Sequence, residues 1–282
     1  MLKKGILIIL LLPLLSFEEV TSTDPKVILS EMIETCYNVE SLVYTQRKTE
    51  RIEGKLSKQI SDIKFQKIPF MVYMKQQYPK KGLEVLFKNG ENGNNALINT
   101  NGFPWVNVSL SPYGERMRNG QHHTVFESGF HYFASIVDHL TKKYEAQKDE
   151  FLNYEGKVKF NDRVCHKIVV DNKNFEYVSH KVGIRQTLLT IAKSKFICEH
   201  MMMEQNPDID DYYDIDEGDI IIRPNDYAKT ITLLIDVERN IPLKLIVHDD
   251  KGLYEQYEFL NLKMNPTIPI EEFDKNNKKY GF

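Results

Sequence analysis

The residues of this chain that could do chemistry gather at 111–133, SPYGERMRNGQHHTVFESGFHYF. Two adjacent histidines, His122 and His123, are followed by Glu127 and then by His131. On a continuous helix the last two would share one face, because residues four apart are neighbours there. Imidazoles and a carboxylate placed together can hold a metal ion or transfer protons. One hypothesis is therefore a metal-dependent hydrolase built on these four side chains.

The same stretch also fits the start of a helix. Thr124 is a favoured N-cap residue, and Glu127 would stand in the first turn, where the helix dipole favours negative charge. No HExxH zinc motif and no serine-centred nucleophile elbow accompany the histidines in the sequence. We prefer this structural interpretation, and we expect no catalytic residue, no metal and no other cofactor.

The N-terminus has the pattern of a secretory signal. In MLKKGILIILLLPLLS, two lysines precede an apolar run that is too short to span a bilayer. We expect residues 1–22 to be a cleaved signal peptide, with no cysteine nearby to anchor a lipoprotein. No later segment is apolar enough for a transmembrane span. The mature protein is expected in the periplasm or outside the cell, as a monomer.

Charge and cysteine content narrow the function classes further. The formal net charge of −3 argues against nucleic-acid binding. Three cysteines, Cys36, Cys165 and Cys198, cannot form a complete disulfide framework. A single bridge between Cys165 and Cys198 would suit an oxidising compartment, whereas scattered cysteines in apolar surroundings are more often buried thiols. The sequence favours buried thiols and leaves the bridge open.

Periodicity predicts two amphipathic helices and many strands. Asp24 and Pro25 open a helix at 24–38, and a second helix is predicted at 125–143. Alternating segments separated by Gly, Pro and Asn turns predict strands. These are 42–53, 55–67, 70–78, 83–88, 95–100, 105–110, 151–160, 164–170, 229–237, 242–249 and 253–263. Their connections are too short for parallel crossovers, so the first six should form an antiparallel meander.

The order of these elements resembles the LolA and LolB family of lipoprotein carriers. The closing stretch LLIDVERNIPLKLIVHDDKGLYEQYEFLNLKMNPTIPIEEF is similar to the carriers' last three strands. The resemblance implies an α+β fold: an antiparallel incomplete β-barrel of about eleven strands, with helices covering its concave face and an apolar cavity beneath them. In the carriers such a cavity holds lipoprotein acyl chains. Here we expect the cavity and its lid to use Val72, Met74, Phe87, Phe126, Phe130 and Phe133.

Residues 175–227 do not fit the meander, and two metal sites can be considered there. Cys198, His200 and Met201–Met203 are soft ligands of the kind that copper accepts. The acidic run 208–219 invites calcium, but its tyrosines and glycine fall at the wrong positions for an EF-hand loop. The methionines fit equally well as the apolar face of a short helix. We therefore predict no metal here.

The segment instead resembles a lysin motif, the small β-α-α-β module that binds N-acetylglucosamine in peptidoglycan. The carrying residues are TLLTIA at 187–192, Asn206 and Pro207, and the later Ile209, Ile215, Gly218, Ile221 and Pro224. The resemblance implies a sugar groove formed by Gln186, Thr187 and Leu188 in one loop and by Asn206, Pro207, Asp208 and Ile209 in the other. Arg185 and Gln186 depart from the motif's usual Gly-Asp, which leaves glycan binding open.

The chain is thus predicted to have a discontinuous half-barrel domain, 23–174 and 228–282, interrupted by the module at 175–227. With the export signal, this combination resembles a family of uncharacterised envelope proteins from diderm bacteria. The predicted function is non-enzymatic: the half barrel binds a lipid or lipoprotein acyl chain, and the module binds peptidoglycan. A third hypothesis is a scaffold for envelope proteins that uses the sheet edge or the tail NNKKYGF, 276–282.

Overall fold

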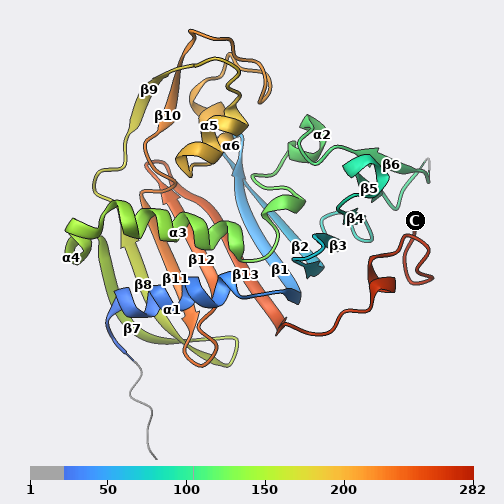
Figure 1. Ribbon diagram of the computed structural model, residues 1–282, viewed down its shortest axis with the longest axis horizontal. Helices are drawn as coiled ribbons and strands as arrows, with labels where there is room; N and C mark the ends of the chain where they lie inside the picture. The colour runs from blue at the N-terminus through green and yellow to red at the C-terminus, as the bar shows by residue number, and fades with distance from the viewer. Residues whose placement is uncertain (1–21, 104) are drawn as a thin grey trace, which may run out of the picture.

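The computed structural model describes residues 22–103 and 105–282, and the predicted signal segment lies outside them except for its last residue. A single large antiparallel sheet dominates the molecule (Figure 1). Its strands are β1 (Ser41–Ile52), β2 (Lys55–Gln66), β3 (Met71–Tyr78), β4 (Glu84–Lys88), β5 (Ala96–Asn99), β6 (Asn107–Leu110), β7 (Leu152–Phe160), β8 (Arg163–Asp171), β11 (Thr230–Asp236), β12 (Pro242–Asp249) and β13 (Gly252–Met264).

Two meanders make up this sheet. The strand order is β6-β5-β4-β3-β2-β1-β13-β12-β11-β8-β7. The pairing of β1 with β13 joins the two meanders. The edge strands β6 and β7 do not pair with each other, so the sheet stays open. The predicted α+β class, the eleven strands and the antiparallel pairing are confirmed.

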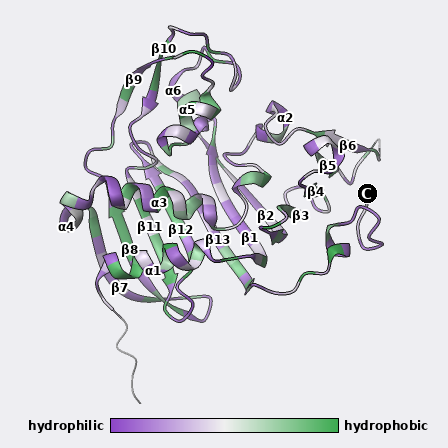
Figure 2. Ribbon diagram, in the orientation of Figure 1, coloured by the Kyte–Doolittle hydropathy of each residue, from purple (hydrophilic) through white to green (hydrophobic). Residues whose placement is uncertain are grey.

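Helices α1 (Pro25–Tyr37) and α3 (His131–Lys143) run together across the half of the sheet that contains β7, β8 and β11–β13 (Figure 1). The side chain of Asp24 accepts a hydrogen bond from the backbone of Lys26, which is the predicted cap. Each helix buries one apolar face, as the mixed colours along it in Figure 2 indicate. The buried residues are Ile28, Leu29, Met32, Ile33 and Cys36 of α1 and Phe133, Ala134, Ile136, Val137 and Leu140 of α3.

The predicted continuous helix at 125–143 is wrong. Thr124 does begin a helical turn, but this is a 3-10 turn, η2 (Val125–Glu127), with a capping box between Thr124 and Glu127. Gly129 then takes a φ of +84°, and α3 begins only at His131. A side chain at Gly129 would meet the ring of Phe65 at 3.0 Å, so glycine is needed there for space as well as conformation. The break separates Glu127 from His131.

The segment between β8 and β11 forms a small unit at the end of the sheet. It contains β9 (Tyr177–Lys181), α5 (Leu188–Lys195), α6 (Glu199–Gln205) and β10 (Ile220–Pro224), and β9 pairs with β10, so the predicted β-α-α-β order is present. Its apolar residues form a core of their own around Leu188, Ile191, Met202 and Ile221. We call residues 172–229 the inserted segment, because Asp171 and Thr230 face each other where the chain leaves and rejoins the sheet.

The inserted segment is not separate from the main sheet, because α6 has two packing faces. Met202 lies in the segment's own core, and Met203 packs against that core. Cys198 and Met201 belong to the core of the large sheet. The methionines are therefore packing residues, as the helical alternative predicted.

All three cysteines are buried and none forms a disulfide. Burial raises the pKa of Cys36 and of Cys198 to about 12 and that of Cys165 to about 11. At neutral pH they are protonated thiols of low reactivity. The preferred interpretation of the cysteines is confirmed.

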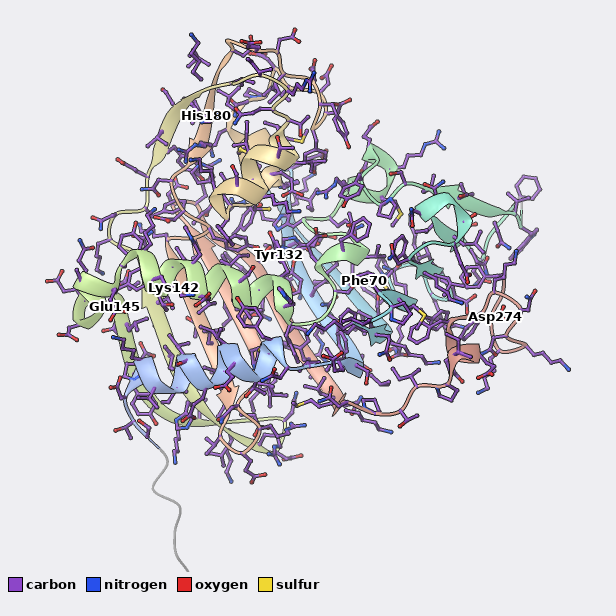
Figure 3. The ribbon with its side chains drawn as sticks, in the orientation of Figure 1. Phe70, Tyr132, Lys142, Glu145, His180 and Asp274 are labelled. Atoms are coloured by element: carbon purple, nitrogen blue, oxygen red, sulfur yellow. The ribbon has the colours of Figure 1, made fainter. Side chains whose placement is uncertain are left out.

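The C-terminal tail is bound to the outer face of the sheet. The ring of Tyr280 stacks on Tyr73 with 3.9 Å between centroids, and the backbone N–H of Gly281 donates to Glu84 over 2.6 Å. Phe273, on the turn η4 (Ile270–Phe273), is buried in the same cluster. Figure 3 marks Asp274 on this tail, away from the inserted segment where His180 is labelled. The tail proposed as a scaffold arm thus packs against its own sheet.

The remaining helical pieces are short. They are η1 (Asn92–Asn94), α2 (Glu115–Arg118), η3 (Glu145–Gln147) and α4 (Lys148–Phe151). In the part of the chain that the structure describes, no helix has the length and apolar character needed to cross a membrane.

Candidate functional site: a cavity with a buried charged end

The four residues singled out for catalysis do not meet. His131 is exposed and contacts the ring of Tyr37. The Glu127 carboxylate accepts hydrogen bonds from the backbone and the hydroxyl of Thr124, at 2.7 and 3.0 Å. Only His122 and His123 enter a common cluster, and their partners come from the sheet. The hydrolase constellation is therefore not formed, because the helix that would carry it breaks at Gly129.

The cluster is built on a pair of glutamates that face each other across β1 and β13. In the antiparallel register Glu50 lies opposite Glu255, and Lys48 lies opposite Tyr257. Both carboxylates are buried, at 1% and 0% exposure. Like charges directly opposite in a sheet are destabilising, and buried charges require partners. The neighbouring side chains must therefore compensate for this pair.

Compensation comes from two histidines, two tyrosines and a lysine. His122 Nδ1 lies 2.8 Å from Glu255 Oε2, and its Nε2 lies 3.0 Å from the carbonyl oxygen of Arg51. His123 Nε2 lies 3.3 Å from the same Glu255 oxygen. The hydroxyl of Tyr227 donates to Glu255 Oε1 over 2.6 Å. We call this group, with Glu50, Lys48 and Tyr257, the Glu255 network.

Glu50 has its own partners in the network. The Tyr257 hydroxyl donates to one oxygen of Glu50 over 2.5 Å, and Lys48 Nζ lies 2.9 Å from the other. Burial alone would raise the pKa of both carboxyls. Lys48 and the histidines outweigh burial and lower the pKa of Glu50, while His123 and His122 hold the pKa of Glu255 well below its usual range. Both glutamates are thus held as carboxylates.

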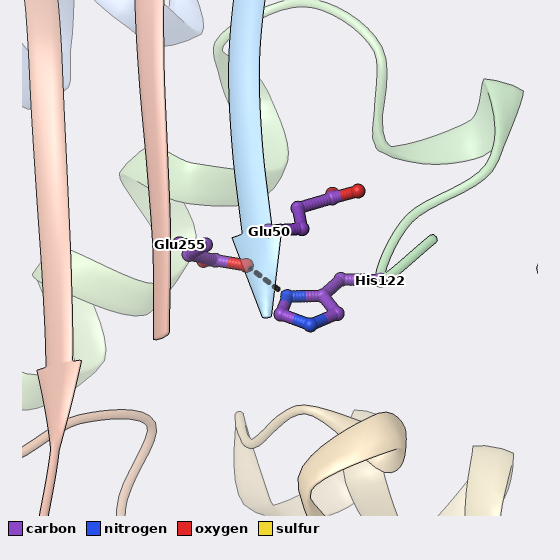
Figure 4. Close-up of side chains that lie close together, drawn as sticks. All are labelled: Glu50, His122 and Glu255. Carbon is purple, nitrogen blue, oxygen red and sulfur yellow. Dashed lines mark hydrogen bonds and ion pairs between the residues drawn. The ribbon is translucent and has the colours of Figure 1, made fainter. Parts of the chain in front are cut away.

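Part of the network has the composition of a metal site. Glu50, His122 and Glu255 bring one ligand atom each to within 4.8 Å of the others (Figure 4). Two carboxylates and an imidazole are ligands that zinc accepts. The oxygens of Glu50, however, already bond Lys48 and Tyr257, and His122 and Glu255 already bond each other. A cation would have to displace these partners, so we interpret the group as a hydrogen-bonded ionic network.

A cavity of about 450 Å³ lies next to this network. One wall is the face of the sheet formed by β1–β5 and β13, and the other is the connecting segment 116–129 with the first residues of α3. The sheet wall is mixed. Its apolar residues are Ile63, Val72, Met74, Val85, Ile98 and Phe259, and among them lie the polar Gln46, Gln59, Ser61 and Gln76. Lys48, His123, Tyr227, Glu255 and Tyr257 line the other end. A pocket that combines apolar residues with converging polar groups is typical of a small-molecule site.

The six residues expected to form the cavity and lid fall into two groups. Val72, Met74 and Phe133 line the cavity. Phe87, Phe126 and Phe130 pack in the core around it, Phe126 against the rings of Phe70, Phe87 and Tyr113 and Phe130 against Phe259. The lid differs from the expected one, because the irregular segment 116–129 rather than a long helix covers this half of the sheet.

The residues that the sequence analysis missed are those of the charged end: Lys48, Glu50, Tyr227, Glu255 and Tyr257. A signal was present on β13, where Glu255 alternates with Tyr257 and Phe259 on one face of the strand. An acidic residue on the inward face of a strand needs a buried partner. The sequence does not reveal that this partner is His122, 133 residues away.

The residues predicted to form a sugar groove are largely engaged in holding the inserted segment together. The Leu188 side chain is fully buried, and Thr187 caps α5. The Asn206 amide bonds the backbone of Met202 and of Ile222. Gln186 Oε1 accepts from the backbone of Gly183. Pro207 and Asp208 are exposed, and Ile209 is half-buried.

Comparisons with solved structures give distant similarities. The chain is similar to lipoprotein LppX of Mycobacterium tuberculosis, with 11% identity, a TM-score of 0.40 and coverage of 87% of this chain and 98% of that one. It is also similar to a LolA superfamily protein from Nitrosomonas europaea, with 10% identity, a TM-score of 0.32 and coverage of 89% of this chain and 98% of that one. A third similar structure is the Pseudomonas aeruginosa MucA/MucB complex, with 13% identity, a TM-score of 0.41 and coverage of 90% of this chain and 61% of that one.

No curated protein matches the chain. A family model described as "Protein of unknown function (DUF1571)" matches residues 39–189, from just before β1 to the start of α5. The match includes β1, the segment 111–133 and more than half of the whole chain. The chain therefore belongs to the DUF1571 family.

Proposed function

We propose that the protein is an exported, non-enzymatic binding protein of the cell envelope, and that its cavity holds an acyl chain or another apolar part of a lipid. The cavity between the sheet and the segment 116–129 carries this proposal. Its volume of about 450 Å³ falls within the range of small-ligand sites, about 300–1,000 Å³. The apolar residues on its sheet wall favour a chain, since burying each methylene group contributes about 0.8 kcal/mol.

Filling part of the cavity with an indole ring should weaken binding. Met74 lines the cavity and is only half-buried, so Met74→Trp places the ring in the ligand's space with limited disturbance of the core. We expect the purified protein to bind the uncharged probe N-phenyl-1-naphthylamine, and methyl dodecanoate to displace it. Met74→Trp should weaken probe binding at least about tenfold, a loss of about 1.4 kcal/mol. Fluorescence titration measures both.

Val164→Trp is the matched control, because Val164 is an exposed apolar residue on β8, away from the cavity. This variant should bind the probe as the unchanged protein does. Absence of saturable binding, or equal binding by Met74→Trp and Val164→Trp, would reject a ligand in the cavity.

We propose in addition that the inserted segment binds peptidoglycan. The resemblance of residues 187–224 to a lysin motif supports this, together with the β-α-α-β order and the pairing of β9 with β10. Since the side chains of Thr187, Leu188 and Asn206 are used within the segment, contacts to sugar would come from the backbone of these loops and from Pro207 and Asp208.

A single exposed change separates glycan binding from folding. Deleting the inserted segment would remove Met201 and Cys198 from the main core, so Pro207→Glu is the better variant. We expect the protein to sediment with purified peptidoglycan sacculi, and Pro207→Glu to lower the affinity about fivefold, which corresponds to a lost contact of about 1 kcal/mol. Lys193→Glu, an exposed change on α5, should leave sedimentation unchanged. Equal sedimentation of both variants would show that these loops do not contact the glycan.

A further inference from the structure

At the charged end of the cavity, His123 has one ring nitrogen with no hydrogen-bond partner. Its Nδ1 is buried, and no described residue lies within bonding distance of it. Its Nε2 is engaged, 3.1 Å from the Tyr227 hydroxyl and 3.3 Å from Glu255 Oε2. Buried polar atoms in folded proteins nearly always have partners. His123 lines the cavity, so an atom of a ligand that enters there can become the missing partner once the ring shifts to expose Nδ1.

The partners of Nε2 help to decide whether Nδ1 is a hydrogen-bond donor or an acceptor. The Tyr227 hydroxyl donates its proton to Glu255 Oε1 over 2.6 Å, so toward His123 this hydroxyl can only accept. The Glu255 carboxylate also only accepts. Nε2 therefore carries a hydrogen. If the ring is charged, Nδ1 carries one as well and needs an acceptor.

The surroundings of His123 favour the charged ring. Burial acts to lower the pKa of His123, but the carboxylates of Glu255, Glu127 and Glu50 outweigh burial and raise it. The rings packed on His123 belong to His122, Tyr132 and Tyr257, and none of these supplies a negative charge at neutral pH. The donor at Nδ1 thus belongs to a cation.

A second cation lines the same end of the cavity. Lys48 Nζ lies 2.9 Å from Glu50 and 3.2 Å from the Gln121 side chain, and both Lys48 and Gln121 line the cavity with His123. An ammonium group has three donors, and these two contacts use two of them. Two positively charged donors, Lys48 and His123, therefore lie in the pocket beside the carboxylates of Glu127 and Glu255, and apolar residues of the sheet line another part of it.

We infer that the ligand is an acyl chain ending in an anionic oxygen acid, a carboxylate or a phosphate, whose oxygen accepts a hydrogen bond from His123 Nδ1 while its chain lies against Val72, Met74 and Phe133. This rests on the proposed binding function and names the ligand class for that cavity. Charge-assisted hydrogen bonds are about twice as strong as neutral ones, so the acid should be preferred over an uncharged molecule of the same length.

Displacement of N-phenyl-1-naphthylamine by four twelve-carbon compounds tests the inference. Dodecanoate and dodecyl phosphate present an anionic oxygen, while dodecanol and methyl dodecanoate do not. We expect at least one of the two anions to bind about tenfold tighter than dodecanol. His123→Gln should reduce this preference to about one. His131→Gln, at an exposed histidine on α3, is the matched control and should keep the preference.

A measurement on the unchanged protein covers the case in which His123→Gln does not fold. The histidine ring signals in NMR should report a shift at His123 Nδ1 on addition of the preferred anion but not of dodecanol. If anions and dodecanol bind equally, or if the preference survives in His123→Gln, the inference is overturned. If none of the four displaces the probe, the proposed cavity function itself fails.

Discussion

Glu255→Leu is expected to lower the free energy of unfolding by about 3–5 kcal/mol, the range for removing one partner of a buried ion pair. Glu255 is fully buried and accepts hydrogen bonds from His122, His123 and Tyr227. Leucine fills a similar volume but leaves these groups without their acceptor. It also leaves the positive charge favoured on His123 with fewer compensating carboxylates. Urea unfolding followed by circular dichroism measures the change.

The matched control is Glu271→Leu, at an exposed glutamate on η4, which should change stability little. Glu255→Gln should cost less than Glu255→Leu, because the amide oxygen still accepts hydrogen bonds. A loss for Glu255→Leu no larger than that of the Glu271 control would show that the Glu255 network does not stabilise the fold.

The same network predicts how stability depends on pH. The pKa of Glu255 is lowered in the folded state, so its contribution is present above the unfolded value of about 4.3 and is lost as the pH falls below it. The pKa of His123 is raised, so its contribution is present below about 6.5 and is lost as the pH rises through the folded value. Glu255→Gln should weaken both dependences.

Arg118→Leu is the second change with a large expected effect. The guanidinium of Arg118, on α2, forms an ion pair with Glu199, on α6, and their side chains are 3% and 9% exposed. This pair connects the segment over the cavity to the inserted segment. Breaking it leaves Glu199 buried without its counter-ion, which should lower the free energy of unfolding by about 3–5 kcal/mol.

A double-mutant cycle isolates this pair. Since replacing both charges removes the unpaired carboxylate, Arg118→Leu with Glu199→Leu should be more stable than Arg118→Leu alone. Lys142→Leu, in the exposed pair of Lys142 with Asp138 on α3, is the control and should show no measurable loss. Additive losses for Arg118 and Glu199 would mean that the two side chains do not interact.

The sequence alone determined what depends on neighbours along the chain. Alternation of apolar residues and turn residues located all eleven strands of the large sheet. Asp24 and Thr124 were correctly predicted as caps, because capping involves residues two or three positions apart. Met202 and Met203 were correctly weighed as packing residues rather than copper ligands, since their spacing fits an apolar helix face.

Only the tertiary structure decided which charged residues meet. Glu127 and His131 are four residues apart, yet Gly129, held against Phe65 from β2, breaks the helix between them. Glu50 and Glu255 come together because β1 pairs with β13 in one particular register. A shift of one residue would turn Glu255 to the other face of the sheet. The chemistry of His123 therefore depends on long-range strand pairing, which no local pattern in the sequence specifies.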